Sequence, residues 1–230
     1  MQPTPLCDNT TNLLERVRRC AQKSQFHNSD ILVLAVSKTR SAEEVRAAHA
    51  CGLTDFGENY LQEALEKIAA LEDLPLIWHF IGPIQSNKTR AIAEHFAWVH
   101  SVDREKIARR LNDQRPVHLA PLNVCLQVNI SGEASKSGAA TDELPALVTA
   151  VAELPRLRLR GLMAIPAATE DTGAQREAFS RMRSLFTELQ AFAPHMDTLS
   201  MGMSADLEAA IAEGASIVRI GTAIFGPRET

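Results

Sequence analysis

Cysteine is scarce in this sequence and carries no pairing signal. The four cysteines, Cys7, Cys20, Cys51 and Cys125, are scattered, no two form a C-x-x-C pair, and no cysteine–histidine spacing fits a structural zinc site. The start of the chain lacks a basic region followed by an apolar one, and no apolar run approaches the length needed to cross a bilayer. We therefore expect four free thiols, a protein of the reducing cytosol and no membrane partner.

Positive charge is not in excess either. The 230 residues include 24 lysines and arginines against 28 aspartates and glutamates, which gives a formal net charge of −4. Because phosphate backbones are bound by clustered Lys and Arg, this balance argues against a nucleic-acid partner. The cationic cluster Arg16, Arg18 and Arg19, beside Glu15, lies in an amphipathic stretch, which favours a solvated helix face.

Apolar runs alternate with segments of helical period from about residue 30 onward, the pattern of a repeated strand–helix unit. The run Ile31–Val36 is apolar at every position, as expected of a parallel strand buried on both sides. Directly after it, Ser41 and Glu44 form a capping box that opens a helix. The predicted strands are Ile31–Ser37, Thr54–Glu58, Ile77–Gly82, Trp98–Val102, Leu122–Ile130, Leu157–Ile165, Thr198–Met201 and Ser216–Gly221.

Such units can close into a barrel or form an open doubly wound sheet, and two observations favour the barrel. Polar residues such as Ser37, Asn59 and Ser200 gather at the predicted strand ends, and in a barrel all these ends meet at one mouth. The dinucleotide fingerprint and the P-loop are both missing. We predict an α/β protein, a single (β/α)₈ TIM barrel domain over residues 1–230, with an extra N-terminal helix at Asn12–Ala21 against its bottom or side.

Lys38 follows six apolar residues at the end of the first predicted strand. Burial in a partly dry barrel mouth would lower the lysine pKa and make the neutral amine available to attack a carbonyl. On position alone, the alternative is a rim lysine whose ammonium group reaches water.

Two glycine-bearing loops follow the seventh and eighth predicted strands. Gly202–Asp206 contains Ser204, which we expect to cap the next helix, and Gly221 and Thr222 follow the last strand. In barrels these two loops form the recurrent phosphate site, because free N–H groups and a helix dipole favour an anion there. Each loop alone would be an ordinary turn, but together they predict phosphate contacts at Ser204, Gly221 and Thr222.

Lys38 and this phosphate site can share one ligand, because the first strand of a closed barrel lies beside the eighth. A ligand with an aldehyde at one end and a phosphate at the other, such as pyridoxal phosphate, fits. An inward-pointing Arg219 would meet the middle of the ligand, where the ring nitrogen lies, and its charge would keep that nitrogen unprotonated. The alternative for Arg219 is an interior salt bridge, for example with Glu58.

Several segments together resemble the pyridoxal phosphate homeostasis proteins: Val36–Thr39, Phe56–Tyr60, Trp78–Gly82 with Gln85–Lys88, Ser200–Ser204 and Arg219–Thr222. The resemblance covers nearly the whole chain and implies the fold-type III barrel of alanine racemases. It implies a Schiff base on Lys38, phosphate contacts from Ser204, Gly221 and Thr222, a ring-nitrogen contact from Arg219 and a ring-side contact from Asn59. No metal is expected.

The same resemblance implies a carrier in vitamin B6 homeostasis rather than an enzyme, because this family is not known to have robust catalysis. Its ligand would be pyridoxal phosphate, its partners apo forms of pyridoxal phosphate enzymes, and we expect a cytoplasmic monomer. The alternatives are an amino acid racemase with this cofactor and a Schiff-base aldolase without it. A two-base racemase needs acid and base on opposite faces of the substrate, and the single tyrosine, Tyr60, is placed after the second strand.

His79, His100 and Lys136 are three further residues whose sequence context indicates a role. His79 and His100 lie inside apolar strands and are expected to be hydrogen-bonded core residues. Lys136 lies in the segment Ser131–Thr141, which combines small residues with one amine and is predicted to be a mobile loop. It would order over the mouth or transiently accept the aldehyde, and the alternative is a solvated lysine.

Overall fold

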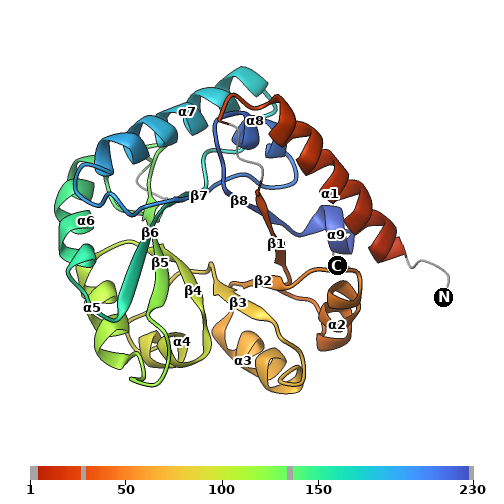
Figure 1. The fold of residues 1–230 in the computed structure, drawn as a ribbon, viewed down its shortest axis with the longest axis horizontal. Coiled ribbons are helices and arrows are strands. Elements are labelled where there is room, and N and C mark those ends of the chain that lie inside the picture. Colours follow the sequence, from red (N-terminus) through yellow and green to blue (C-terminus); the bar gives the residue numbers. More distant parts are fainter. Residues whose placement is uncertain (1–4, 27–29, 134–136, 228–230) are drawn as a thin grey trace.

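The computed structural model describes residues 5–26, 30–133 and 137–227. Eight parallel strands close into a barrel in chain order, with β8 paired to β1, and helices surround it (Figure 1). The predicted barrel is confirmed, and each strand ends within two residues of its predicted bounds. The strands are β1 (Leu32–Val36), β2 (Asp55–Glu58), β3 (Ile77–Phe80), β4 (Trp98–Val102), β5 (Leu122–Val128), β6 (Leu157–Ala164), β7 (Thr198–Ser200) and β8 (Ile217–Ile220).

The helices of the described residues cover the outside of the barrel. They are α1 (Pro5–Lys23), α2 (Ala42–Ala50), α3 (Leu61–Ala70), α4 (Thr89–His95), α5 (Glu105–Gln114), α6 (Leu144–Ala152), α7 (Thr172–Leu189), α8 (Leu207–Ala212) and the short α9 (Thr222–Phe225), with a 3₁₀ turn at Thr141–Glu143. The predicted capping box of α2 is present, with Ser41 and Glu44 each accepting from the other's backbone N–H. Across the described part of the chain, no helix combines the length and apolar character that a membrane crossing requires.

The large hydrophobic core lies between the strands and the helices. Side chains alternate along each strand, so every second residue faces outward. Phe56 of β2 packs against Trp78 of β3 and Phe80 packs against Phe96, with ring centroids 5.9 and 5.3 Å apart. These rings are buried in the cluster that joins strands to helices. The alternate side chains of each strand therefore point into the barrel, and they include most of the polar strand residues.

Strand pairing sets which residues meet inside the barrel. Leu34 lies opposite Arg219, Gly57 opposite His79, and Ser200 opposite Ile217. His79 and His100 are fully buried there and hydrogen-bonded, so they are core residues as predicted.

The N-terminal helix is longer than predicted, because α1 begins at Pro5 rather than near Asn12. The stretch before Asn12 has few apolar residues, so its helical period is weak. In the structure, tertiary contacts supply the missing stabilisation: α1 packs on α2, α8 and α9, and Asn9 donates to the Ile224 carbonyl of α9. The helix therefore lies along the side of the barrel, across the seam between β8 and β1 (Figure 1).

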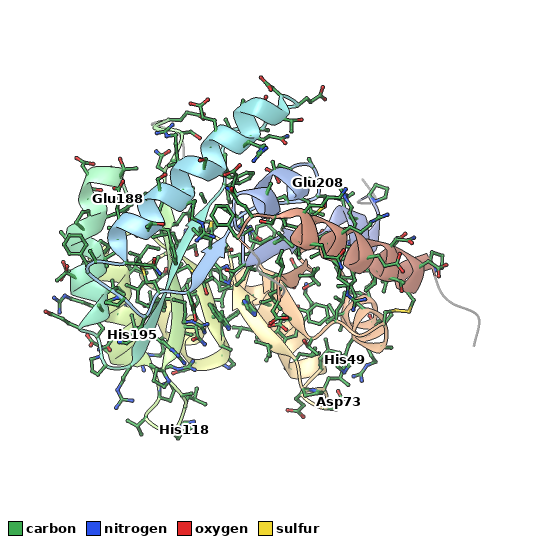
Figure 2. The ribbon with its side chains drawn as sticks, turned by 45° about the horizontal axis from the view of Figure 1, so that its top comes forward. His49, Asp73, His118, Glu188, His195 and Glu208 are labelled. Atoms are coloured by element: carbon green, nitrogen blue, oxygen red, sulfur yellow. A yellow bond between two sulfur atoms is a disulfide. The ribbon has the colours of Figure 1, made fainter. Side chains whose placement is uncertain are left out.

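The expectation of four free thiols is wrong for one pair. Cys7 of α1 and Cys51, just after α2, form a disulfide whose Cα atoms are 5.1 Å apart, visible as the yellow bond in Figure 2. Cys20 and Cys125 are free. The two bonded cysteines are 44 residues apart in sequence, and only the packing of α1 beside α2 brings them together. No local motif could have indicated this pairing.

The expected solvated cationic face of α1 is correct for two of its three arginines. Arg18 and Arg19 are exposed. Arg16 instead forms an ion pair with Glu208 of α8, with Nη2 2.7 Å from Oε2, and joins the two helices. Glu208 is labelled beside α1 in Figure 2.

Candidate functional site

A cavity of about 280 Å³ opens where the strands end, and all six residues predicted for the site line it. This volume is near the lower end of the range of roughly 300–1,000 Å³ for small-molecule sites. The predicted residues are Lys38, Asn59, Ser204, Arg219, Gly221 and Thr222, and they come from the ends of β1, β2, β7 and β8. Val36, Arg40, Ile81, Ile165 and Met203 also line the cavity.

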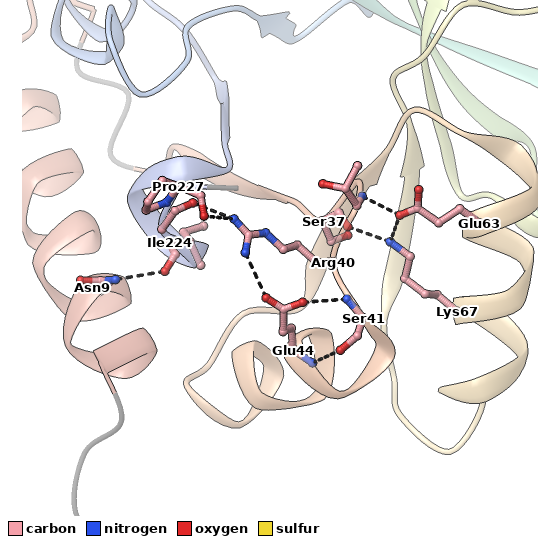
Figure 3. A network of polar contacts seen from close by, with 11 residues as sticks. Asn9, Ser37, Arg40, Ser41, Glu44, Glu63, Lys67, Ile224 and Pro227 are labelled. Atoms are coloured by element: carbon pink, nitrogen blue, oxygen red, sulfur yellow. Dashed lines mark hydrogen bonds and ion pairs between the residues drawn. The ribbon is translucent and has the colours of Figure 1, made fainter. Parts of the chain in front are cut away.

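Lys38 is half-buried at the end of β1, and its two neighbours are held from the outside of the barrel by α3. The Lys67 ammonium donates to the Ser37 carbonyl at 2.7 Å, and the Thr39 N–H donates to Glu63 Oε1 at 2.6 Å. Thr39 has a φ of 65°, a left-handed conformation that is costly for a β-branched residue. The backbone on both sides of Lys38 is therefore fixed by charged side chains (Figure 3).

Glu58, Glu63 and Lys67 form one network, which we call the α3 clamp. Lys67 Nζ lies 2.6 Å from Oε1 of both glutamates, and the Ser37 hydroxyl donates to the same Glu58 oxygen. Glu58 is fully buried, and burial raises its pKa although Lys67 and Ser37 act in the opposite direction. The suggested Glu58–Arg219 salt bridge is wrong, because Glu58 points outward to α3 while Arg219 points inward.

Asn59 continues β2 into the cavity wall. Its Oδ1 is buried and has no hydrogen-bond partner among the described residues. Gly82, at the predicted end of the third strand, lies against the Asn59 backbone, where an added Cβ would collide with the Asn59 carbonyl. A buried acceptor without a protein donor is costly by itself, so it suits a ligand that brings a hydroxyl or N–H group.

The two predicted phosphate loops lie side by side at the cavity. Gly221 precedes α9, Thr222 is its first residue, and no side chain caps this end. The first N–H groups of a helix have no intrahelical acceptor, so they are available to an anion. A Cβ on Gly221 would lie 3.3 Å from the Val36 carbonyl oxygen, so this loop packs closely against the end of β1.

Ser204 lines the cavity but is not the cap of α8, which corrects the prediction. The cap position belongs to Asp206, and the Asp206 carboxylate accepts from the Met203 N–H at 2.6 Å instead of from the helix. The turn at residues 204–206 separates Ser204 from the helix start. Ser204 therefore lines the cavity without capping α8.

Arg219 points into the barrel, as the sequence argument required. Its Nη1 donates to the carbonyl and hydroxyl oxygens of Ser200 at 2.6 and 2.8 Å, and its Nη2 donates to the Ala164 carbonyl at 2.8 Å. Burial lowers its pKa to about 10. The guanidinium group is therefore charged at neutral pH.

Sequence reasoning missed Arg40, although it lines the cavity. Its guanidinium donates to the Gly226 and Pro227 carbonyls at 2.7 and 3.1 Å and pairs with Glu44 of α2 (Figure 3). Arg40 thus fastens the end of α9 to the start of α2. Its signal in the sequence was only its position two residues after Lys38. Lys136 and the tail Arg228–Thr230 lie outside the described residues.

The comparisons with known proteins agree with this geometry. The family model for the alanine racemase N-terminal domain matches residues 9–229. The "Pyridoxal phosphate homeostasis protein" of Pseudomonas aeruginosa is 63% identical over 97% of this chain and 96% of its own, and that of Escherichia coli is 52% identical over 97% of both. The structure of PipY from Synechococcus elongatus with PLP bound has a TM-score of 0.85 at 35% identity and covers 96% of this chain and 100% of its own.

Proposed function

Since the chain belongs to the family of pyridoxal phosphate homeostasis proteins, within the alanine racemase N-terminal domain family, we propose that it binds pyridoxal phosphate as a Schiff base on Lys38. The observation that carries the proposal is the common cavity, in which one amine and two glycine-bearing loops from adjacent strands line the same space. The bound group would supply an aldehyde for the imine and a phosphate as its anchor.

The residues divide into an imine end and an anchoring end. Lys38 would attack the aldehyde carbon, with water as the leaving molecule. Backbone N–H groups at Gly221 and Thr222 and the Ser204 hydroxyl would bind the phosphate. Arg219 would donate to the ring nitrogen and, because it stays charged at neutral pH, would leave that nitrogen without its own proton. Asn59 supports the fit, because its unpaired Oδ1 would gain a donor.

Absorbance and chemical trapping test this proposal. Purified protein loaded with pyridoxal phosphate should be yellow, and borohydride reduction followed by peptide mapping should place the adduct on Lys38. The matched variants are Lys38→Ala and Lys88→Ala, because Lys88 is exposed in the loop before α4 and outside the lining of the cavity. The visible band should persist in Lys88→Ala. A Lys38→Ala protein that keeps the band, or label on another lysine, would refute the assignment.

We further propose that the chain holds and passes on the cofactor without turning over amino acids. The titratable side chains among the described residues that line the cavity are Lys38, Arg40 and Arg219, and a racemase needs a second acid or base facing the first. Tyr60 is 55% exposed and is not among those lining residues. Charged Arg219 also weakens the ring as an electron sink, compared with a carboxylate partner.

Two measurements on the loaded protein separate a carrier from an enzyme. L- and D-amino acids in deuterated water should exchange their α-protons far more slowly than about 1 per second, a rate ordinary for enzymes. An apo enzyme that requires this cofactor should regain activity when mixed with the loaded protein, which we propose acts as a cytosolic monomer. Exchange at an enzyme-like rate would contradict the carrier function and favour a racemase. Absence of any reactivation would contradict transfer.

A further inference from the structure

A row of polar side chains crosses the barrel interior from the base of β2 to the cavity. Asp55 Oδ1 lies 3.0 Å from His79 Nε2, and His79 Nδ1 lies 3.0 Å from His100 Nε2. His100 Nδ1 lies 2.8 Å from Ser200 Oγ, which in turn accepts from Arg219 Nη1 at 2.8 Å. The row thus uses one residue each from β2, β3, β4, β7 and β8.

The members of this row are buried. His79, His100 and Ser200 are fully buried, and Asp55 and Arg219 are 7% and 4% exposed. The His79 ring stacks on Trp98, with centroids 5.4 Å apart and planes 7° apart, and Arg160 lies over the same indole at 4.6 Å. The ring orientation of His79 is therefore fixed by stacking as well as by hydrogen bonds.

Burial favours the neutral form of both histidines. Burial lowers the pKa of His79, although Asp55 acts in the opposite direction, and burial lowers the pKa of His100 well below its ordinary value, with the charge of Arg219 acting in the same direction. A neutral imidazole has one donor nitrogen and one acceptor nitrogen. Each ring in the row must therefore donate on one side and accept on the other.

The two ends of the row decide the direction of every bond in it. Asp55 accepts at both oxygens, from the Thr54 hydroxyl at Oδ2 and from His79 at Oδ1. His79 thus carries its proton on Nε2, and its Nδ1 accepts from His100 Nε2–H.

His100 Nδ1 is then the acceptor of the Ser200 hydroxyl proton. Ser200 Oγ keeps its lone pairs for Arg219, which can only donate. All four bonds run the same way, from the guanidinium to the carboxylate.

We propose that Asp55, His79, His100 and Ser200 form a positioning relay that fixes the direction in which Arg219 presents its charge to the cavity. Asp55 sets the proton position of both histidines from the far end of the barrel. Ser200 donates its hydroxyl proton to His100, and its oxygen therefore accepts from Arg219. Reversal of the relay would make His100 Nδ1–H a donor to Ser200 Oγ, so the Ser200 hydroxyl would no longer donate to His100 and its proton would need another acceptor. The consequence for a bound ring rests on the proposed function, whereas the relay itself does not.

Nitrogen-15 NMR of the histidine rings tests the relay without any ligand. His79 and His100 should both carry the proton on Nε2. His49 and His95 provide the internal contrast, because their Nδ1 atoms lie 2.9 Å from the carbonyl oxygens of Leu53 and Ala91 and must donate to them. Nδ1-protonated His79 or His100 in the unmodified protein would overturn the relay.

Two aspartate variants then test whether Asp55 sets the direction. Asp55→Ala should remove the Nε2–H form from at least one of the two buried rings. Asp73→Ala, which removes an exposed partner of Arg46, should leave both unchanged. Retention of both Nε2–H forms in Asp55→Ala would show that Asp55 does not direct the relay.

The effect on the cavity is measured as the release rate of pyridoxal phosphate. Ser200→Ala should release it about tenfold faster, the size of one lost charge-assisted hydrogen bond, and should shift the absorbance of the bound state. Ser200→Thr keeps the hydroxyl and should restore both. Equal release from Ser200→Ala and the unmodified protein would refute the link to Arg219, while failure of the unmodified protein to bind would refute the proposed function and leave the NMR result standing.

Discussion

Removal of the Lys67 ammonium by Lys67→Met tests the α3 clamp at its centre. Lys67 is 5% exposed and bonds to both glutamates and to the Ser37 carbonyl. The substitution leaves the fully buried Glu58 with the Ser37 hydroxyl as its remaining described partner. Breaking a buried ion pair on one side typically costs about 3–5 kcal/mol, because a buried charge is left uncompensated. We expect a loss of that size in the free energy of unfolding at pH 8.

The loss should depend on pH in one direction. The folded-state pKa of Glu58 is raised above its unfolded value. Its contribution to stability is therefore fully present below the unfolded pKa of about 4.3 and is lost as pH rises through the folded pKa. Without Lys67 this pKa rises further, so protonation of Glu58 relieves a growing part of the penalty as pH falls. The difference between variant and unmodified protein should then be smaller at pH 5 than at pH 8.

Urea unfolding at both pH values is the assay, with two companion variants. Arg46→Met breaks the exposed pair with Asp73, whose distance is 2.6 Å, and should destabilise the fold far less than Lys67→Met at pH 8, because exposed ion pairs contribute little. The double variant Glu58→Gln/Lys67→Met removes both charges and should recover most of the loss. A Lys67→Met penalty equal to that of Arg46→Met at pH 8, or one that grows as pH falls, would refute the reasoning.

Two further predictions concern the cavity and the disulfide. Gly221→Val should accelerate cofactor release at least tenfold, because a branched side chain must fit beside the Val36 carbonyl. Ser204→Ala loses one hydroxyl and should accelerate release about fivefold. Equal release rates in the two variants would argue against a close approach of the backbone to the phosphate. Cys7→Ser should lower the free energy of unfolding by roughly 4 kcal/mol, because the bond to Cys51 closes a loop with a sequence separation of 44. Denaturation with and without a reductant measures this, and a reductant should have no effect on the variant.

The fold was largely predictable because the strands and helices of a parallel barrel can be recognised from short stretches of sequence. β1 is a short apolar run followed by Ser37, and β4 was predicted with the same bounds that the structure has. The cavity residues followed from strand order, since Lys38 had to lie near the loop at Gly221 once β1 was paired with β8.

The errors arose where the outcome depends on long-range packing. Lys67 reads as an ordinary polar position of α3, and no local signal shows that it reaches Glu58 and the Ser37 carbonyl. Ser204 is a residue type that favours helix caps, yet Asp206 takes that position in the chain. The Cys7–Cys51 bond depends on where α1 docks, which its own amphipathic period does not specify.

The pairing of β1 with β8 also has a consequence for protein synthesis. Lys38 leaves the ribosome early in synthesis. The opposite half of the cavity emerges only after nearly the whole barrel has been made, because it is formed by Ser204, Arg219 and Gly221. A nascent chain can therefore expose the amine without any anchor for a phosphate. Contacts between such distant segments form late in folding, so a pocket divided in this way can select its ligand only after translation has passed β8. Free aldehydes that reach Lys38 before then would find nothing else to hold them.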